Sequence, residues 1–122
     1  MVNILLVLVG GGLGSLLRYG SSLLAAKLFG DGFAWGTLFV NLVGCLLIGF
    51  IVGCVDRALL SKASRVFLVT GVLGGLTTFS SFSLESVRLL QESFCKGFAN
   101  IALNLVGGFL LTFAGLWIAG AI

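Results

Sequence analysis

The sequence contains no histidine and no proline, and only 9% of its 122 residues are charged. Without histidine the chain cannot form the Ser/His or Cys/His pairs of nucleophilic enzymes, and it offers no familiar metal-binding cluster. A soluble domain carries about a quarter charged residues, far more than this chain. In addition, 59% of the residues in this chain are hydrophobic. These absences argue against most enzyme classes and indicate a membrane protein that is not an enzyme.

Cysteine is scarce and odd in number: Cys45, Cys54 and Cys95. Two of the three fall inside a long hydrophobic run, so neither a disulfide framework nor a metal-ligand spacing follows. We interpret the cysteines as small packing residues. The net charge of +3 is typical of the basic loops of a membrane protein, and we expect no nucleic-acid partner.

Four long hydrophobic runs lie between the few charges. A helix needs about 20 apolar residues to cross the hydrocarbon core of a bilayer. The first run has no basic residue ahead of it and is too long for a signal peptide, so we expect it to be retained. Because the connections are too short for a second domain, we expect one all-α membrane domain over residues 1–122. Its four transmembrane helices are predicted at about residues 3–28, 33–55, 66–91 and 97–121.

The basic residues are almost evenly divided between the two sides of the membrane. With four spans, the termini and the second loop share one side, and the other two loops share the opposite side. The first side has Arg57, Lys62 and Arg65, and the second has Lys27 and Lys96, with Arg88 and Arg18 if these reach outward. Because the Lys/Arg bias sets orientation, this near tie permits insertion in both directions. The alternative is that a single basic residue decides the orientation.

Glycine is abundant, with 19 residues, and many glycines stand four positions from another small residue. Small residues at this spacing form a flat stripe against which another membrane helix packs closely. The stripes are Gly10 with Gly14, Gly11 with Ser15, Gly49 with Gly53, and Gly71 with Gly75. We interpret them as packing surfaces without chemistry. Four helices do not easily enclose a polar path, so we expect a homo-oligomer, most simply a closed dimer.

One internal correspondence appears at an offset of 63 residues. The tetrapeptide NLVG at residues 41–44 returns at residues 104–107, and GGL at 11–13 returns as GGL at 74–76. The same shift relates the first run to the third and the second to the fourth. Either the chain is a duplication of a two-helix unit or these Leu- and Gly-rich segments match by chance. In both cases Asn41 and Asn104 occupy corresponding positions.

The third run is unusual, because residues 71–83 (GVLGGLTTFSSFS) contain three glycines and five hydroxyl residues. Glycine disfavours a continuous helix, and Ser and Thr side chains compete for backbone hydrogen bonds. These residues predict a break in the helix around residues 74–79. Irregular backbone at membrane depth is tolerated only inside protein or beside a water-filled cavity, and its free carbonyls are natural cation ligands. The alternative is a plain bend.

A few polar and aromatic side chains are candidates for an ion path. Asn41 shares a helix face with Thr37, and Asn104 shares one with Thr112, although an isolated membrane Asn also serves to join two helices. Phe79 and Phe82 are three apart, and their partly positive ring edges could solvate a small anion, although packing is the common role of such residues. Arg18 either concentrates anions at a pore mouth or reaches out to the interface.

Three segments together resemble a known family. They are GGLGSLLRY at residues 11–19, WGTLFVNLVG at 35–44, and GVLGGLTTFSSFS at 71–83. In this order and spacing they resemble the Fluc (CrcB-type) fluoride channels of microbes, and the similarity extends over essentially the whole chain.

The resemblance implies an antiparallel, dual-topology homodimer in the cell (inner) membrane, with two pores that passively export fluoride and relieve its toxicity. It also implies a structural sodium ion (Na+) at the dimer centre, held by backbone carbonyls. The implied fluoride path comprises Asn41, Phe79, Phe82, Ser80, Ser81, Thr112 and Arg18, with Asn104 as the alternative to Thr112, and the implied sodium ligands are Gly74 and Thr77.

Two other functions fit the sequence less well. A small dual-topology multidrug exporter has similar size, but such exporters carry a proton-exchanging carboxylate in the first helix. Here the first run contains Arg18 and no acid, and the nearest candidate, Glu85, ends the third run. A structural subunit of a larger membrane complex is the other alternative, and it would give no ion flux when purified alone.

Overall fold

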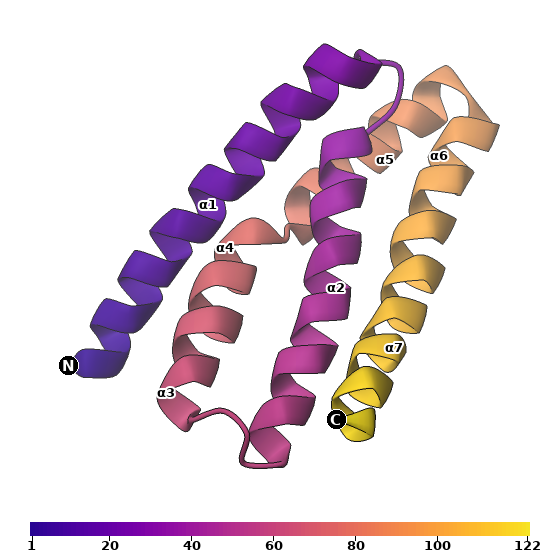
Figure 1. The fold of residues 1–122 in the computed structure, drawn as a ribbon. Helices are drawn as coiled ribbons and strands as arrows, with labels where there is room; N and C mark the ends of the chain where they lie inside the picture. The colour runs from indigo at the N-terminus through magenta and orange to yellow at the C-terminus, as the bar shows by residue number, and fades with distance from the viewer.

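The computed structural model describes residues 1–122 and contains helices without strands. Four helices are long and apolar enough to cross a membrane, which confirms the predicted number: Val2–Phe29, Trp35–Asp56, Lys62–Glu92 and Phe94–Ala121. Figure 1 shows both termini and the loop after the second helix at one end, and the other two loops at the opposite end. The four helices therefore run alternately between the two ends of the molecule.

The first two helices are continuous. Helix α1 covers Val2–Phe29 and α2 covers Trp35–Asp56. Neither contains proline, and the apolar side chains repeat all around them, as expected for helices surrounded by lipid and protein. Helix α1 ends at Gly30, whose φ of 74° is a left-handed conformation that glycine adopts without strain. This turn directs the chain into the short loop before α2.

The third helix is built from several segments. It consists of α3 (Lys62–Arg65), the π-helix η1 (Val66–Leu73), α4 (Gly74–Leu76) and α5 (Phe79–Glu92). Between α4 and α5, Thr77 and Thr78 have extended backbone, with φ/ψ of −82°/155° and −151°/122°. The Thr78 hydroxyl accepts a hydrogen bond from the Ser81 backbone N–H at 3.2 Å and so caps α5. Figure 1 shows the chain changing course between α4 and α5.

The fourth helix follows Ser93, whose extended backbone separates it from α5. It consists of α6 (Phe94–Ala102), the π-helix η2 (Leu103–Gly107) and α7 (Gly108–Ala121), joined without an extended residue. Two of the four membrane helices therefore contain a π-helical stretch, and such stretches are frequent at functional sites.

The small-residue stripes are the closest points of helix packing. A Cβ added at Gly10 would lie 3.0 Å from the Cα of Gly71, and one at Gly14 would lie 2.9 Å from the backbone N of Leu76. On the other side of the bundle, a Cβ at Gly115 of α7 would lie 2.7 Å from the backbone N of Phe50. The prediction that these glycines serve close packing is confirmed, with α1 against the third helix and α2 against the fourth.

The offset of 63 residues seen in the sequence is the register in which α2 packs against the fourth helix. The side chains of Asn41 and Asn104 are hydrogen bonded, and a Cβ at Gly108 would lie 3.1 Å from the Sγ of Cys45. Both pairs are separated by 63 positions in the chain. Corresponding residues of the two NLVG segments thus lie side by side across the helix contact.

Few side chains are buried within the single chain: 21 of 122 residues. The apolar core is a small cluster of Val40, Ile51, Leu73 and Leu76. The largest fully buried side chains are Val40 and Asn100. A soluble protein would not expose so many large apolar side chains, whereas a bilayer covers them, and an asparagine at the centre of such a molecule requires hydrogen-bond partners.

Candidate functional site

The side-chain amide of Asn41 pairs with the backbone N–H and C=O of Thr78, at the extended backbone between α4 and α5. Asn41 Nδ2 donates to the Thr78 carbonyl at 3.1 Å, and Asn41 Oδ1 accepts from the Thr78 N–H at 2.9 Å. This double hydrogen bond replaces helix bonds that the extended residues cannot make. It satisfies backbone groups that would be costly to leave unpaired in a membrane.

The hydrogen bonds continue from Asn41 into the fourth helix. Asn41 Nδ2 also donates to Asn104 Oδ1 at 3.0 Å. Asn104 Nδ2 donates to the backbone carbonyl of Asn100 at 2.9 Å and to its Oδ1 at 3.2 Å. Asn100 Nδ2 in turn donates to the Ser86 hydroxyl of α5 at 2.9 Å. We call these four side chains, Asn41, Asn104, Asn100 and Ser86, the amide relay.

The extended backbone leaves two carbonyls without their usual helical partners. In a continuous helix the Thr78 N–H would bond the Gly74 carbonyl, but here it donates to Asn41. The Ser81 N–H would bond the Thr77 carbonyl, but here it donates to the Thr78 hydroxyl. Hard cations prefer such oxygen ligands. The backbone of Gly74 and Thr77 therefore fits the sodium ion that the resemblance implies.

A groove opens beside this backbone, and we call it the break groove. Its volume is about 350 Å³, and its lining includes Asn41, Gly74, Thr77, Thr78, Phe79, Phe82 and Asn104. The ring centroids of Phe79 and Phe82 are 5.5 Å apart with an angle of 60° between the planes. Phe79 is 75% exposed and Phe82 is 7% exposed. The two rings therefore differ in surroundings although both line the groove.

A polar cavity lies on the other side of Thr78. It has a volume of about 220 Å³ and is lined by Ser15, Arg18, Tyr19, Ser22, Thr37, Thr78, Ser81 and Glu85. Hydroxyl groups and the Arg18 guanidinium supply hydrogen-bond donors here. One basic residue, Arg18, and one acidic residue, Glu85, line this cavity together.

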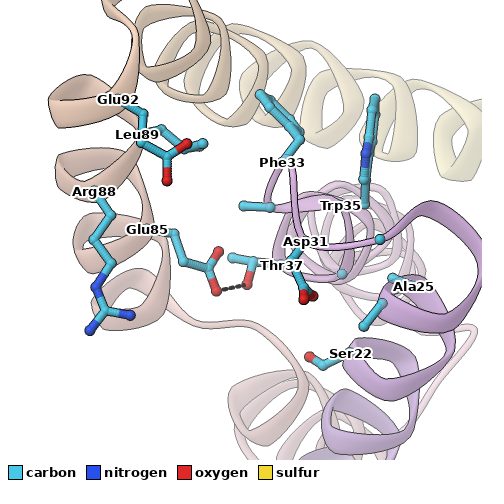
Figure 2. Close-up of a pocket in the computed structure, with 14 residues that line it drawn as sticks. Ser22, Ala25, Asp31, Phe33, Trp35, Thr37, Glu85, Arg88, Leu89 and Glu92 are labelled. Atoms are coloured by element: carbon cyan, nitrogen blue, oxygen red, sulfur yellow. Dashed lines mark hydrogen bonds between the residues drawn. The ribbon is translucent and has the colours of Figure 1, made fainter.

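A wider pocket of about 400 Å³ adjoins the polar cavity and shares Ser22, Thr37 and Glu85 with it. Figure 2 shows Thr37 and Glu85 pointing toward each other in the pocket lining, with Arg88 and Glu92 on the same helix as Glu85. Thr37 Oγ1 donates to Glu85 Oε1 at 3.0 Å, whereas Glu85 Oε2 is buried without a hydrogen-bond partner. The polar cavity thus shares lining residues with the wider pocket and, through Thr78, with the break groove.

The candidate site residues from the sequence fall into three groups. Those that line the break groove are Asn41, Phe79, Phe82, Gly74 and Thr77, and those that line the polar cavity are Arg18 and Ser81. Ser80 is exposed at the start of α5. Thr112 lies in α7 outside these cavities, where its backbone carbonyl approaches Gly49, whereas Asn104 lines the groove.

The sequence analysis does not identify three residues that the structure places in the polar cavity or the amide relay: Glu85, Asn100 and Ser86. Glu85 was treated as the end of the third run, yet it stands four residues after Ser81, and this spacing places both on one helix face. Asn100 likewise precedes Asn104 by one helical turn. Ser86 gave no signal in the sequence, because its partner Asn100 lies on a different helix.

Comparison with known proteins adds to this geometry. Residues 5–116 match the family described as CrcB-like protein, Camphor Resistance (CrcB). The fluoride-specific ion channel FluC of Clostridium perfringens is 50% identical over 103 residues, which cover 83% of this chain and 80% of the relative. FluC of Agrobacterium fabrum is 49% identical over 119 residues, covering 95% and 94%. FluC of Thermus thermophilus is 44% identical over 127 aligned positions, covering 100% and 98%.

Proposed function

Because the chain belongs to the CrcB-like protein family, we propose that it is a passive, fluoride-selective channel that exports fluoride and relieves its toxicity. It is a multi-pass protein of the cell membrane, with four helices capable of spanning it. The relatives named fluoride-specific ion channel cover most of the chain. The observation that carries the proposal is the break groove, which combines side-chain amides with two phenylalanine rings and backbone polar groups within the third helix that is long enough to span a membrane.

The physical requirement for fluoride is a replacement for its hydration shell. Transfer of a small ion into an apolar medium would cost tens of kcal/mol, so donors must follow the ion along its path. Ser81 and Arg18 line the polar cavity, and the ring edges of Phe79 and Phe82 carry partial positive charge. A weakly positive edge solvates an anion without binding it tightly, which suits rapid passage.

Asn41 has a specific constraint within this path. Both hydrogens of its Nδ2 are donated, one to the Thr78 carbonyl and one to Asn104 Oδ1. A fluoride ion that binds this amide must therefore replace one of those two acceptors. In our proposal Asn41 both supports the extended backbone and exchanges one hydrogen bond with the passing ion.

We propose that the active form is an antiparallel homodimer with two pores. Phe79 is 75% exposed and Ser80 is exposed beside extended backbone at membrane depth. Polar and irregular backbone is not tolerated against lipid, so this face requires protein to cover it. A second copy of the chain in the opposite orientation is the cover we propose, and the near tie in Lys and Arg residues supports insertion in both orientations.

We further propose that the dimer binds one sodium ion through the Gly74 and Thr77 carbonyls of both copies. Thr77→Ser should retain the ion, because only the backbone of Thr77 binds it and the serine hydroxyl can still donate to the Leu73 carbonyl. Asn41→Leu should lose it, because the Thr78 N–H is then free to bond Gly74. Crystal structures of both variants would test this at the central density, and loss of the ion in Thr77→Ser would show that the site is assigned wrongly.

Halide efflux from liposomes tests the channel proposal. Liposomes containing the purified protein would be given a potassium ionophore to compensate charge, and fluoride and chloride would be followed by electrodes in parallel. Rapid fluoride release without chloride release is expected. Release of neither ion would contradict the proposal and would favour a structural subunit, and fluoride release that needs a proton gradient would favour coupled transport.

A further inference from the structure

Helix α5, which carries Phe79 and Phe82, is joined to the rest of the chain by three sets of side-chain hydrogen bonds. Glu85 accepts from Thr37 of α2, and the Thr78 peptide that precedes α5 pairs with Asn41 of α2. Ser86 accepts from Asn100 of α6. Figure 1 shows α5 rising from α4 to the loop that joins it to α6. These polar contacts therefore help to fix the position of the two rings, together with the packing of the buried Phe82 and Leu89.

The amide relay has only one arrangement in which every donor meets an acceptor. The Thr78 N–H can only donate and its carbonyl can only accept, so they fix which way the Asn41 amide points. At the other end, the backbone carbonyl of Asn100 accepts from Asn104 Nδ2, so a reversed Asn104 would place two acceptors together. Asn100 then has its Oδ1 toward Asn104 and its Nδ2 toward Ser86. The relay thus connects the start of α5 with its middle through two other helices.

Ser86 and Asn100 lie outside the ion path. Neither lines the break groove or the polar cavity. Asn100 is 0% exposed and Ser86 is 4% exposed, so neither side chain can touch an ion in those spaces. A buried polar pair is costly unless its partners are in place. The pair is also closely held, because a Cβ added at Gly97 of α6 would lie 2.7 Å from the backbone N of Leu90.

We propose that Ser86 and Asn100 are positioning residues for fluoride conduction. They hold α5 against α6 and keep the Asn104 amide directed at Asn41, and Asn41 in turn holds the backbone of Thr78, which directly precedes Phe79. This inference rests on the proposed function and deepens it. Removal of the Ser86 hydroxyl leaves Asn100 Nδ2 without an acceptor, and the strain is relieved by movement of α5 relative to Asn41.

The test compares fluoride efflux per folded protein in liposomes. Ser86→Ala and Asn100→Leu should each slow fluoride efflux about five- to tenfold, the rate equivalent of one net buried hydrogen bond. Ser86→Thr should restore the rate because it keeps the hydroxyl acceptor. Cys54→Ala is the matched control: it also removes one buried side-chain atom, but Cys54 lies outside the relay and the three cavities. Wild-type efflux in folded Ser86→Ala and Asn100→Leu would overturn the inference, as would equal slowing by Cys54→Ala.

Two further measurements separate positioning from simple stabilisation. The double variant Ser86→Ala with Asn100→Leu should be no slower than Asn100→Leu alone, because both changes act on one contact; additive slowing would contradict a shared relay. Amide hydrogen exchange at Thr78, followed by NMR in detergent, should accelerate in Ser86→Ala and not in Cys54→Ala. If the wild-type protein passes no fluoride, the channel proposal fails, while unchanged Thr78 exchange in Ser86→Ala would refute the relay independently.

Discussion

At the scale of single residues, the two phenylalanines of the break groove occupy different environments. Phe82 is buried, at 7% exposure, whereas Phe79 is 75% exposed on the chain surface. Their rings are nevertheless in contact, with centroids 5.5 Å apart. Of the two rings, only Phe82 contributes substantially to packing within the chain.

We predict that Phe79→Ile and Phe82→Ile both slow fluoride efflux strongly, because each removes a ring edge while retaining most of the apolar volume. Phe82→Ile should also lower the free energy of unfolding by about 1–2 kcal/mol, since a buried side chain changes shape. Phe79→Ile should leave the stability of the single chain almost unchanged. Liposome efflux and thermal unfolding in detergent measure the two effects, with gel filtration to check that the dimer is intact. Unchanged efflux from an intact dimer would refute the aromatic path.

Single residues of the site differ in how far the sequence could predict them. Asn41 and Asn104 stand out because amides are rare in long apolar runs, and their hydrogen bond agrees with the 63-residue offset. Asn100 could have been found from its one-turn spacing to Asn104. Ser86 could not, because serine is common near helix ends and its burial depends on where α6 packs. Side-chain pairing between helices is a tertiary property that spacing within one helix does not contain.

At the scale of helices, the glycine stripes decide which helices approach each other. Gly14 of α1 is buried, and a Cβ there would lie 2.9 Å from the backbone N of Leu76 and closer still to the Val72 carbonyl. Gly12 lies on the same helix with nothing within 4 Å of an added Cβ. The two glycines therefore separate the effect of close packing from that of helix propensity.

We predict that Gly14→Ala lowers the free energy of unfolding by about 1–3 kcal/mol, because overpacking forces backbone against backbone. Gly12→Ala should be neutral or stabilising by up to about 1 kcal/mol, because alanine favours the helix. Thermal unfolding of both variants in the same detergent makes the comparison. Equal destabilisation by the two substitutions would mean that the α1 contact with the third helix is not set by the glycine stripe.

The helices show which structural features can be predicted from residues that are close together in the sequence. Four apolar runs predicted four membrane-spanning helices because bilayer thickness and helix rise fix the required length. The three glycines and five hydroxyl residues at 71–83 led to an expected break at 74–79, and the extended residues Thr77 and Thr78 lie within that range. The π-helices η1 and η2 were not expected. A π-helix differs from an α-helix only in the hydrogen-bond partner of each N–H group. That choice depends on the packing of neighbouring helices, and no residue pattern in this sequence predicts it.

At the scale of the whole molecule, the single chain leaves its functional elements at the surface. The break groove is open on one side, and Phe79 and Ser80 are exposed beside extended backbone. The sequence could predict that more than four helices are needed to surround a polar path. The orientation of the second copy that we propose depends instead on the small balance of basic loop residues, which two substitutions can change.

We therefore predict that a variant with extra basic residues on one side of the membrane does not conduct alone. Two variants with the extra residues on opposite sides should conduct when they are expressed together. Leu59→Lys with Ala63→Lys adds two positive charges to one side, and Gly32→Lys with Gln91→Lys adds two to the opposite side; all four positions are exposed. Each variant alone should insert in one orientation, so that antiparallel dimers do not form and fluoride efflux falls by more than tenfold. Coexpression of the two variants should restore efflux, because each supplies the orientation that the other lacks. Cysteine labelling of loop positions from each side of the membrane would establish orientation, and full efflux from a variant shown to have one orientation would refute the antiparallel dimer.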